Sequence, residues 1–74
     1  MVRPEVAVND ALSRARAALA KSPIFDLREL RVEMFRDSLV ISGTVSSFYH
    51  KQLAQEVVRT ASEGAELVNT IHVQ

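Results

Sequence analysis

The fold of this chain is decided by two stretches, Leu39-Val40-Ile41-Ser42-Gly43-Thr44-Val45 and Leu67-Val68-Asn69-Thr70-Ile71-His72-Val73. Both are rich in β-branched residues, which favour strands. Residues 48–63 lie between them and carry apolar side chains at helical spacing. The sequence therefore predicts a strand–helix–strand unit over the second half of the chain.

Two further elements precede this unit. Residues 6–21 carry apolar side chains at spacings of three and four, which is typical of a helix, and Ser22-Pro23 ends it. Residues 30–35 alternate apolar and polar side chains, as a strand with one buried face does. A tight turn at Asp37-Ser38 is expected to join this strand to residues 39–45. The predicted order is α-β-β-α-β, an α+β fold with two helices packed on one face of a three-stranded sheet.

The position of the last strand in the sheet is open. It can pair antiparallel with the strand at 30–35 or parallel with the strand at 39–45, and we favour the first arrangement. Gly43 inside a strand indicates a backbone that another element approaches closely, and we expect a packed helix there. Asn69 lies on a mostly buried strand face, so we expect it to find hydrogen-bond partners near the end of the second helix.

Composition excludes several classes of protein. The 74 residues form one small domain with a core over about residues 6–74, or one module of a longer protein. There is no cysteine, which excludes disulfides and thiolate metal sites. Nine basic and nine acidic residues give a formal net charge of zero. Nucleic acid is therefore not an expected partner, because its binding proteins carry a basic excess.

Neither an apolar run of the roughly 20 residues that span a bilayer nor a secretory signal is recognisable. As written, the chain is expected in the cytoplasm. It is expected to be periplasmic or envelope-associated if it is excised from a longer exported protein.

No catalytic constellation is recognisable. We find no acid–base pair, no nucleophile beside a base and no Gly-rich phosphate loop. His50 falls in the apolar stripe of the second helix and is interpreted as a partly buried, hydrogen-bonded histidine. His72 is placed on the outer face of the last strand, and no third ligand stands at a metal-binding spacing. The expectation is a non-enzymatic chain with no catalytic residues, no metal and no cofactor.

The start of the second predicted helix is the most suggestive segment, Ser46-Ser47-Phe48-Tyr49-His50-Lys51. Unpaired N–H groups at a helix start favour a phosphate or carboxylate, and exposed aromatic rings beside a cation suit a lipid interface. The candidate residues for ligand or lipid binding are Ser46, Ser47, Phe48, Tyr49 and Lys51. The alternative is that the serines only cap the helix and that Phe48 packs back as a hydrophobic staple.

A second candidate surface is the sheet face that the helices leave bare. The residues expected to face the helices are Leu30, Val32, Leu39, Ile41, Leu67, Ile71 and Val73. The opposite, candidate interaction face then carries Phe35, Val40, Val68 and His72. Such a face can dock another protein domain or support a weak homo-oligomer. The alternative is an ordinary solvated face with scattered apolar residues.

Charged residues interleave in the first half of the chain. Arg28, Arg31 and Arg36 alternate with acidic residues, among them Asp26 and Glu33. We expect ion pairs on a solvated face, and an anion-binding patch is the remaining interpretation.

In this order and spacing, the features resemble the BON domain, a module named after bacterial osmotic-stress and nodulation proteins. The resemblance covers nearly the whole chain and rests on residues 39–45, on Ala54, Val57 and Val58 of the second helix, on Gly64 and on residues 68–73. The chain departs from the family pattern at Ser38, where glycine is frequent, and at Ala65, where a larger hydrophobe is common. The resemblance implies a non-catalytic binding module in a stress or envelope context. Phospholipid surfaces or anionic ligands are the first expected partners, and protein interaction or oligomerisation is the alternative.

Overall fold

The computed structural model describes residues 4–74, with side chains from residue 10 onward. The helices are α1 (Pro4–Ala20), α2 (Phe25–Arg28) and α3 (Phe48–Ser62), and the strands are β1 (Arg31–Phe35), β2 (Ser38–Ser42), β3 (Thr44–Val45), β4 (Glu66–Asn69) and β5 (His72–Val73). Within residues 4–74, none of the helices combines the length and the apolar content that crossing a bilayer requires.

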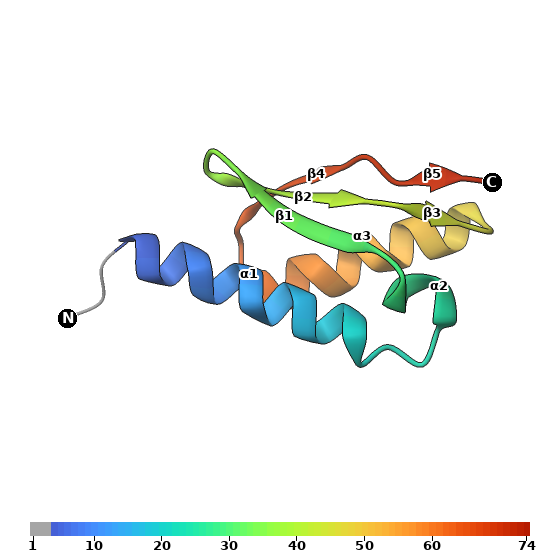
Figure 1. Cartoon of the computed structure of the whole chain (residues 1–74), viewed down its shortest axis with the longest axis horizontal. Helices are drawn as coiled ribbons and strands as arrows, with labels where there is room; N and C mark the ends of the chain where they lie inside the picture. The colour runs from blue at the N-terminus through green and yellow to red at the C-terminus, as the bar shows by residue number, and fades with distance from the viewer. Residues whose placement is uncertain (1–3) are drawn as a thin grey trace.

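The helices lie together on one face of the sheet and leave the other face bare (Figure 1). Helices α1 and α3 pack against each other beneath the strands. The predicted α+β fold, with two helices on one face of a three-stranded sheet, is confirmed. The structure adds the one-turn helix α2 between α1 and β1, which the sequence analysis did not predict.

The strand order is β1-β2-β4, with β1 antiparallel and β4 parallel to β2. Our preference for pairing between the last strand and the first was therefore wrong. The last strand runs in the same direction in both arrangements, so only the edge that it joins differs. The outer edge of β1 instead faces α1, where Arg16 donates a hydrogen bond from Nε to the carbonyl oxygen of Val32 at 2.9 Å.

The strands bend together without losing register. Regular pairing is interrupted at Gly43, between β2 and β3, and at residues 70–71, between β4 and β5. Ile41 is aligned with Asn69 before this interruption and Thr44 with His72 after it, so the offset in residue number between the paired strands stays constant. The backbone N–H of His72 donates to the carbonyl oxygen of Gly43 at 2.9 Å within the break. Strands β3 and β5 therefore continue the β2–β4 pair beyond a shared bend.

Gly43 makes this bend sterically feasible. Its φ is +131°, and a Cβ added there would lie 2.8 Å from Cδ2 of Leu30. The close neighbour is thus the residue before β1, rather than the packed helix that we expected. Leu30 is buried and needs this space to reach the core.

Asn69 connects the bend to α3. Its Nδ2 donates to the carbonyl oxygen of Lys51 at 3.3 Å and to Oε1 of Gln55 at 3.1 Å, while its Oδ1 accepts from the N–H of Ile71 at 3.0 Å. The expected hydrogen-bond partners exist, but they lie in the first half of α3 instead of near its end.

The core lies between the helices and the inner sheet face. Its buried apolar residues are Ala15, Leu19, Leu27, Leu30, Val32, Leu39, Ile41, Val45, Ala54, Val58 and Ile71. The four-residue spacing of Ala11, Ala15 and Leu19 places one stripe of α1 against this core. Val73 was expected to face the helices, and this prediction was wrong. Its side chain is 41% exposed, because β5 pairs only with β3 in the described sheet and lies at an edge.

The hairpin turn is also displaced from its predicted position. Phe35 is aligned with Ser38, so the two turn residues are Arg36 and Asp37. The left-handed conformation falls on Arg36, with φ 57°. Ser38 is therefore a strand residue, and the steric cost of a positive φ falls on Arg36 instead.

The substitution Gly43→Ala should lower the free energy of unfolding by about 1–3 kcal/mol, since the new Cβ meets Leu30 in a backbone conformation that suits glycine. Chemical denaturation measures this change. Gly64→Ala is the control: Gly64 also has a positive φ of 93°, but a Cβ there meets no atom within 4 Å. Equal losses in the two variants would contradict the role given to Leu30.

Candidate functional site

The start of α3 is already occupied by a carboxylate of the chain itself. Oδ2 of Asp26, in α2, accepts hydrogen bonds from the backbone N–H of Ser46 at 2.8 Å and from its hydroxyl at 2.7 Å. Nδ1 of His50 lies 3.1 Å from the same oxygen. A helix start favours an anion, and here Asp26 supplies it. The donors of Ser46 are therefore engaged inside the protein.

Ser47 caps the helix in the expected way. Its hydroxyl oxygen accepts from the backbone N–H of His50 at 3.1 Å, and its backbone is extended. The capping interpretation thus fits Ser47 alone, because Ser46 bonds Asp26 of α2 instead of the helix. Their binding to an external ligand stays a prediction.

The surroundings of Asp26 favour its charged form. Its pKa lies below the ordinary value, first because the Ser46 hydroxyl donates to the carboxylate, and then because the Ser46 backbone N–H and His50 bond to it. Our expectation of an aspartate in surface ion pairs missed this role. The spacing of three between Ile24, Leu27 and Leu30 was a signal for the short helix that carries Asp26, but not for the contact of Asp26 with Ser46.

Ser46, His50 and Asp26 are the residue types of a hydrolytic catalytic triad, but their geometry differs from that of a triad. A triad requires the histidine to bond the serine hydroxyl. Here both Ser46 and His50 bond the same oxygen of Asp26, and no hydrogen bond joins their side chains. His50 is thus the partly buried, hydrogen-bonded histidine that the sequence predicted. Over residues 10–74, His, Asp and Glu side chains form no group of three suited to a metal ion.

Aromatic rings project from the same end of the molecule. Phe48 is 62% exposed, Tyr49 is 68% exposed, and Phe25 of α2 is 63% exposed. The Asp26 bonds join α2 to the start of α3, and these two elements lie at one end of the fold, near β3 and β5 (Figure 1). We call the three rings, with Arg28 and Lys51, the aromatic end. Phe25 and Arg28 were not among the predicted site residues.

Each cation of the aromatic end lies over a ring. The Lys51 ammonium is 5.9 Å from the centroid of the Phe48 ring, and the Arg28 guanidinium carbon is 5.6 Å from that of Phe25. Phe48 is exposed and therefore does not serve as the buried staple of the alternative interpretation. Beside it lies a hollow of about 250 Å³ lined by Phe48, Lys51, Gln52, Gln55 and Asn69.

The bare sheet face is less apolar than the candidate residues alone suggest. Phe35 and His72 are exposed and Val68 is 44% exposed, whereas Val40 is half-buried. Val40 is aligned with Val68 and with Glu33, so one apolar pair is flanked by a charge. In the aligned pair next to it on this face, the Ser38 hydroxyl donates a hydrogen bond to Oε1 of Glu66 at 3.0 Å. All four predicted residues lie on the strands as expected, and interaction through them stays a prediction.

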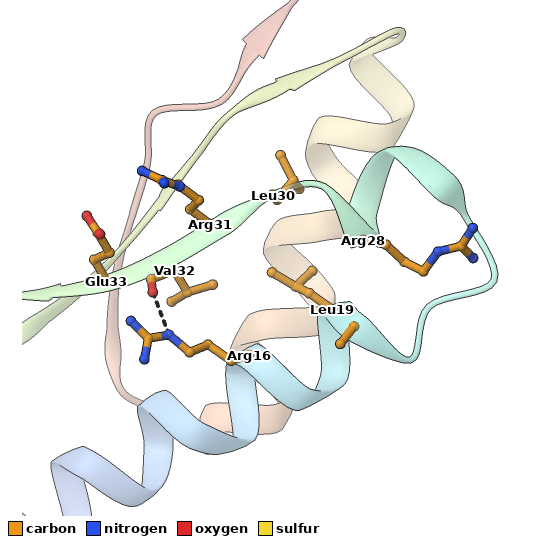
Figure 2. Close-up of a pocket in the computed structure, with 8 residues that line it drawn as sticks. Arg16, Leu19, Arg28, Leu30, Arg31, Val32 and Glu33 are labelled. Atoms are coloured by element: carbon orange, nitrogen blue, oxygen red, sulfur yellow. Dashed lines mark hydrogen bonds between the residues drawn. The ribbon is translucent and has the colours of Figure 1, made fainter.

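Three arginines, Arg14, Arg16 and Arg28, bond backbone carbonyls. Arg16 bonds the carbonyl of Val32, and Arg28 bonds that of Ser22 at 3.0 Å. Over residues 10–74, arginine ion pairs form from Arg14 to Asp10 and Glu63 and from Arg59 to Glu56. The expected pairs around Arg31 and Arg36 do not form among these residues. Arg31 and Glu33 are two residues apart on β1 and extend from the same side of the strand (Figure 2), but they form no ion pair.

The substitution Asp26→Asn should lower stability at neutral pH, because it removes the anion that the start of α3 favours. A lowered pKa stabilises the fold above the pKa of the unfolded state, and this contribution is lost as the pH falls through the folded value. The stability difference between the native protein and Asp26→Asn should therefore be full above about pH 5 and shrink below about pH 4. Urea titrations across this range measure it.

Asp37→Asn is the control for this experiment, because it removes a carboxylate from the exposed hairpin turn. A difference between the native protein and Asp26→Asn that stays constant down to pH 2 would contradict the role of the Asp26 charge.

Comparison with known proteins agrees with this architecture. The family model of the BON domain matches residues 8–74 of the chain. A search of curated proteins gave no match. The match extends from α1 to the end of β5 and so includes every strand of the fold. On this basis the chain belongs to the BON domain family.

Proposed function

We propose that this protein is a non-catalytic binding module that attaches to anionic phospholipid surfaces through the aromatic end. The family is one of non-catalytic binding domains, and phospholipid binding is reported for it. The observation that carries the proposal is the exposure of Phe25, Phe48 and Tyr49 together at one end, beside two cations. The expected setting is a stress response or the cell envelope.

The exposed rings supply the apolar part of the attachment. Full burial of a large apolar side chain contributes about 1.5–3 kcal/mol. Each ring is roughly two-thirds exposed, so its transfer into the headgroup region contributes about 1–2 kcal/mol. Aromatic rings are favoured at this depth because they are amphipathic or polarisable.

The cations supply the electrostatic part. A lysine or arginine near an anionic leaflet contributes about 1 kcal/mol. Arg28 and Lys51 together therefore add about 2 kcal/mol. The hollow beside Lys51, with the amides of Gln52 and Gln55, offers hydrogen-bond donors to a headgroup. These magnitudes predict reversible attachment that weakens with salt.

The internal hydrogen bonds of Asp26 also favour attachment to a lipid surface over binding of a single phosphate at the start of α3. That carboxylate engages the N–H and the hydroxyl of Ser46, the residue before the N-cap of α3. Ligand contact then falls to Phe48, Tyr49 and Lys51, with Phe25 and Arg28 added. Ser46 and Ser47 act as positioning residues.

A second candidate function is protein docking or weak self-association through the bare sheet face. The cross-strand alignment of Val40 with Val68 favours it, since the pair is continuous and no helix covers it (Figure 1). The small apolar area and the nearby Glu33 make this surface the weaker candidate.

The double substitution Phe48→Ser with Lys51→Glu should weaken binding to phosphatidylglycerol-containing vesicles at least tenfold. It removes an exposed ring and reverses a charge while leaving the core intact. Co-sedimentation measures this change, and native binding should fall with added salt and be weak on phosphatidylcholine vesicles.

The hairpin offers a matched control. Phe35 is 64% exposed, and the Arg36 guanidinium carbon lies 5.5 Å from its ring centroid, at the other end of the molecule. Phe35→Ser with Arg36→Glu therefore makes the same chemical change away from the aromatic end and should leave binding unchanged. Equal effects of the two double variants would overturn the proposal. Val68→Lys should spare vesicle binding and disrupt only self-association or protein docking.

A further inference from the structure

A groove runs between the second half of α1 and the outer edge of β1 (Figure 2). Its volume is about 320 Å³, at the lower end of the range of ligand sites, about 300–1,000 Å³. The buried side chains of Leu19, Leu30 and Val32 form its apolar floor. Three arginines and Glu33 form the rim, so the groove is apolar below and mainly cationic above.

The edge of β1 that borders this groove carries unpaired backbone groups. Phe35 and Ser38 flank a two-residue turn, and such a pair exchanges both hydrogen bonds. Alternation along an antiparallel pair then directs the N–H and C=O groups of Val32 and Met34 away from β2. The bond from Arg16 to the Val32 carbonyl agrees with this direction. A carbonyl has two lone pairs, so Arg16 leaves one of them available.

The arginines are spread along the groove instead of converging on one point. Figure 2 shows Arg16 beside Val32, with Arg28 at the opposite end, near α2. Arg31 and Glu33 extend from β1 on the far side of the strand from Arg16. All three arginines are exposed. This spacing suits charges distributed along an extended chain better than a single small anion.

We propose that this groove binds an extended acidic peptide segment that adds to the sheet at the edge of β1. Strand addition uses backbone hydrogen bonds for affinity and alternate side chains for specificity. The expected segment alternates small apolar residues, which face Leu19 and Val32, with acidic residues, which face Arg31. Three arginines against one glutamate on the rim give the charge complementarity that selects an acidic partner.

This site shares Arg28 with the proposed membrane attachment and otherwise uses different residues. Arg31 belongs to the groove alone, whereas Arg28 also contacts Phe25 of the aromatic end. A variant of Arg31 therefore tests the groove while leaving the vesicle-binding residues unchanged. Failure of one proposal leaves the other standing.

The test is NMR titration of the full chain with a blocked peptide of alternating glutamate and valine, about six residues long. The expected result is saturable shifts of the Val32 and Met34 amides and of the Arg16 Nε–H, with affinity that falls as salt is added. A peptide with lysine in place of glutamate should not bind. A peptide with glycine in place of valine should bind several-fold more weakly, because it leaves the floor uncovered.

The substitution Arg31→Glu should weaken peptide binding about tenfold, since it turns attraction into repulsion. Arg36→Glu is the matched control, because Arg36 is also exposed but lies in the hairpin turn. The proposal is overturned by an absence of saturable shifts at millimolar peptide, by shifts centred on other elements, by equal binding of the lysine peptide, or by equal losses in the two arginine variants.

Discussion

The carboxylate of Asp26 fixes how α2 meets the start of α3, and the proposed lipid-binding surface depends on this contact. It joins the one-turn helix α2 to α3 through Ser46 and His50, while its neighbour Leu27 is fully buried. Because an internal anion engages the N–H and hydroxyl of Ser46, these two donors are not available to a ligand phosphate. The same contacts hold α2, which carries the exposed ring of Phe25, against the start of α3, which carries the exposed rings of Phe48 and Tyr49. The contact between α2 and α3 and the proposed lipid attachment thus both depend on the charge of Asp26.

The sheet contributes a second constraint. The bend at Gly43 lets Leu30 enter the core, and Asn69 connects the matching bend of the last strand to α3. With β4 and β5 placed beside β2 and β3, the outer edge of β1 lies next to α1 and forms the arginine-rimmed groove. The two proposed surfaces therefore follow from different features: the lipid-binding end from the α2–α3 contact, and the peptide groove from the strand order.

The sequence predicts the layers of this fold well, because long apolar patterns report on long elements. The capping of α3 by Ser47, the exposure of Phe48 and the partial burial of His50 also follow from local position on a helix. Asp26 could not be found in this way, since it contacts Ser46 across 20 residues from a helix of four residues. The strand order escaped prediction for a related reason: β4 has the same direction beside β1 or β2, and the choice depends on tertiary contacts such as that of Arg16 with Val32.

The most direct test of the account is paramagnetic relaxation in the presence of phosphatidylglycerol bicelles that carry a spin label near the headgroups. The account predicts strong broadening of the amide signals of Phe25, Phe48 and Tyr49, and little broadening at the hairpin around Phe35, because only the first group lies at the aromatic end. Strongest broadening at the hairpin, or on the bare sheet face around Val40 and Val68, would contradict the central claim that this end of the molecule meets the membrane.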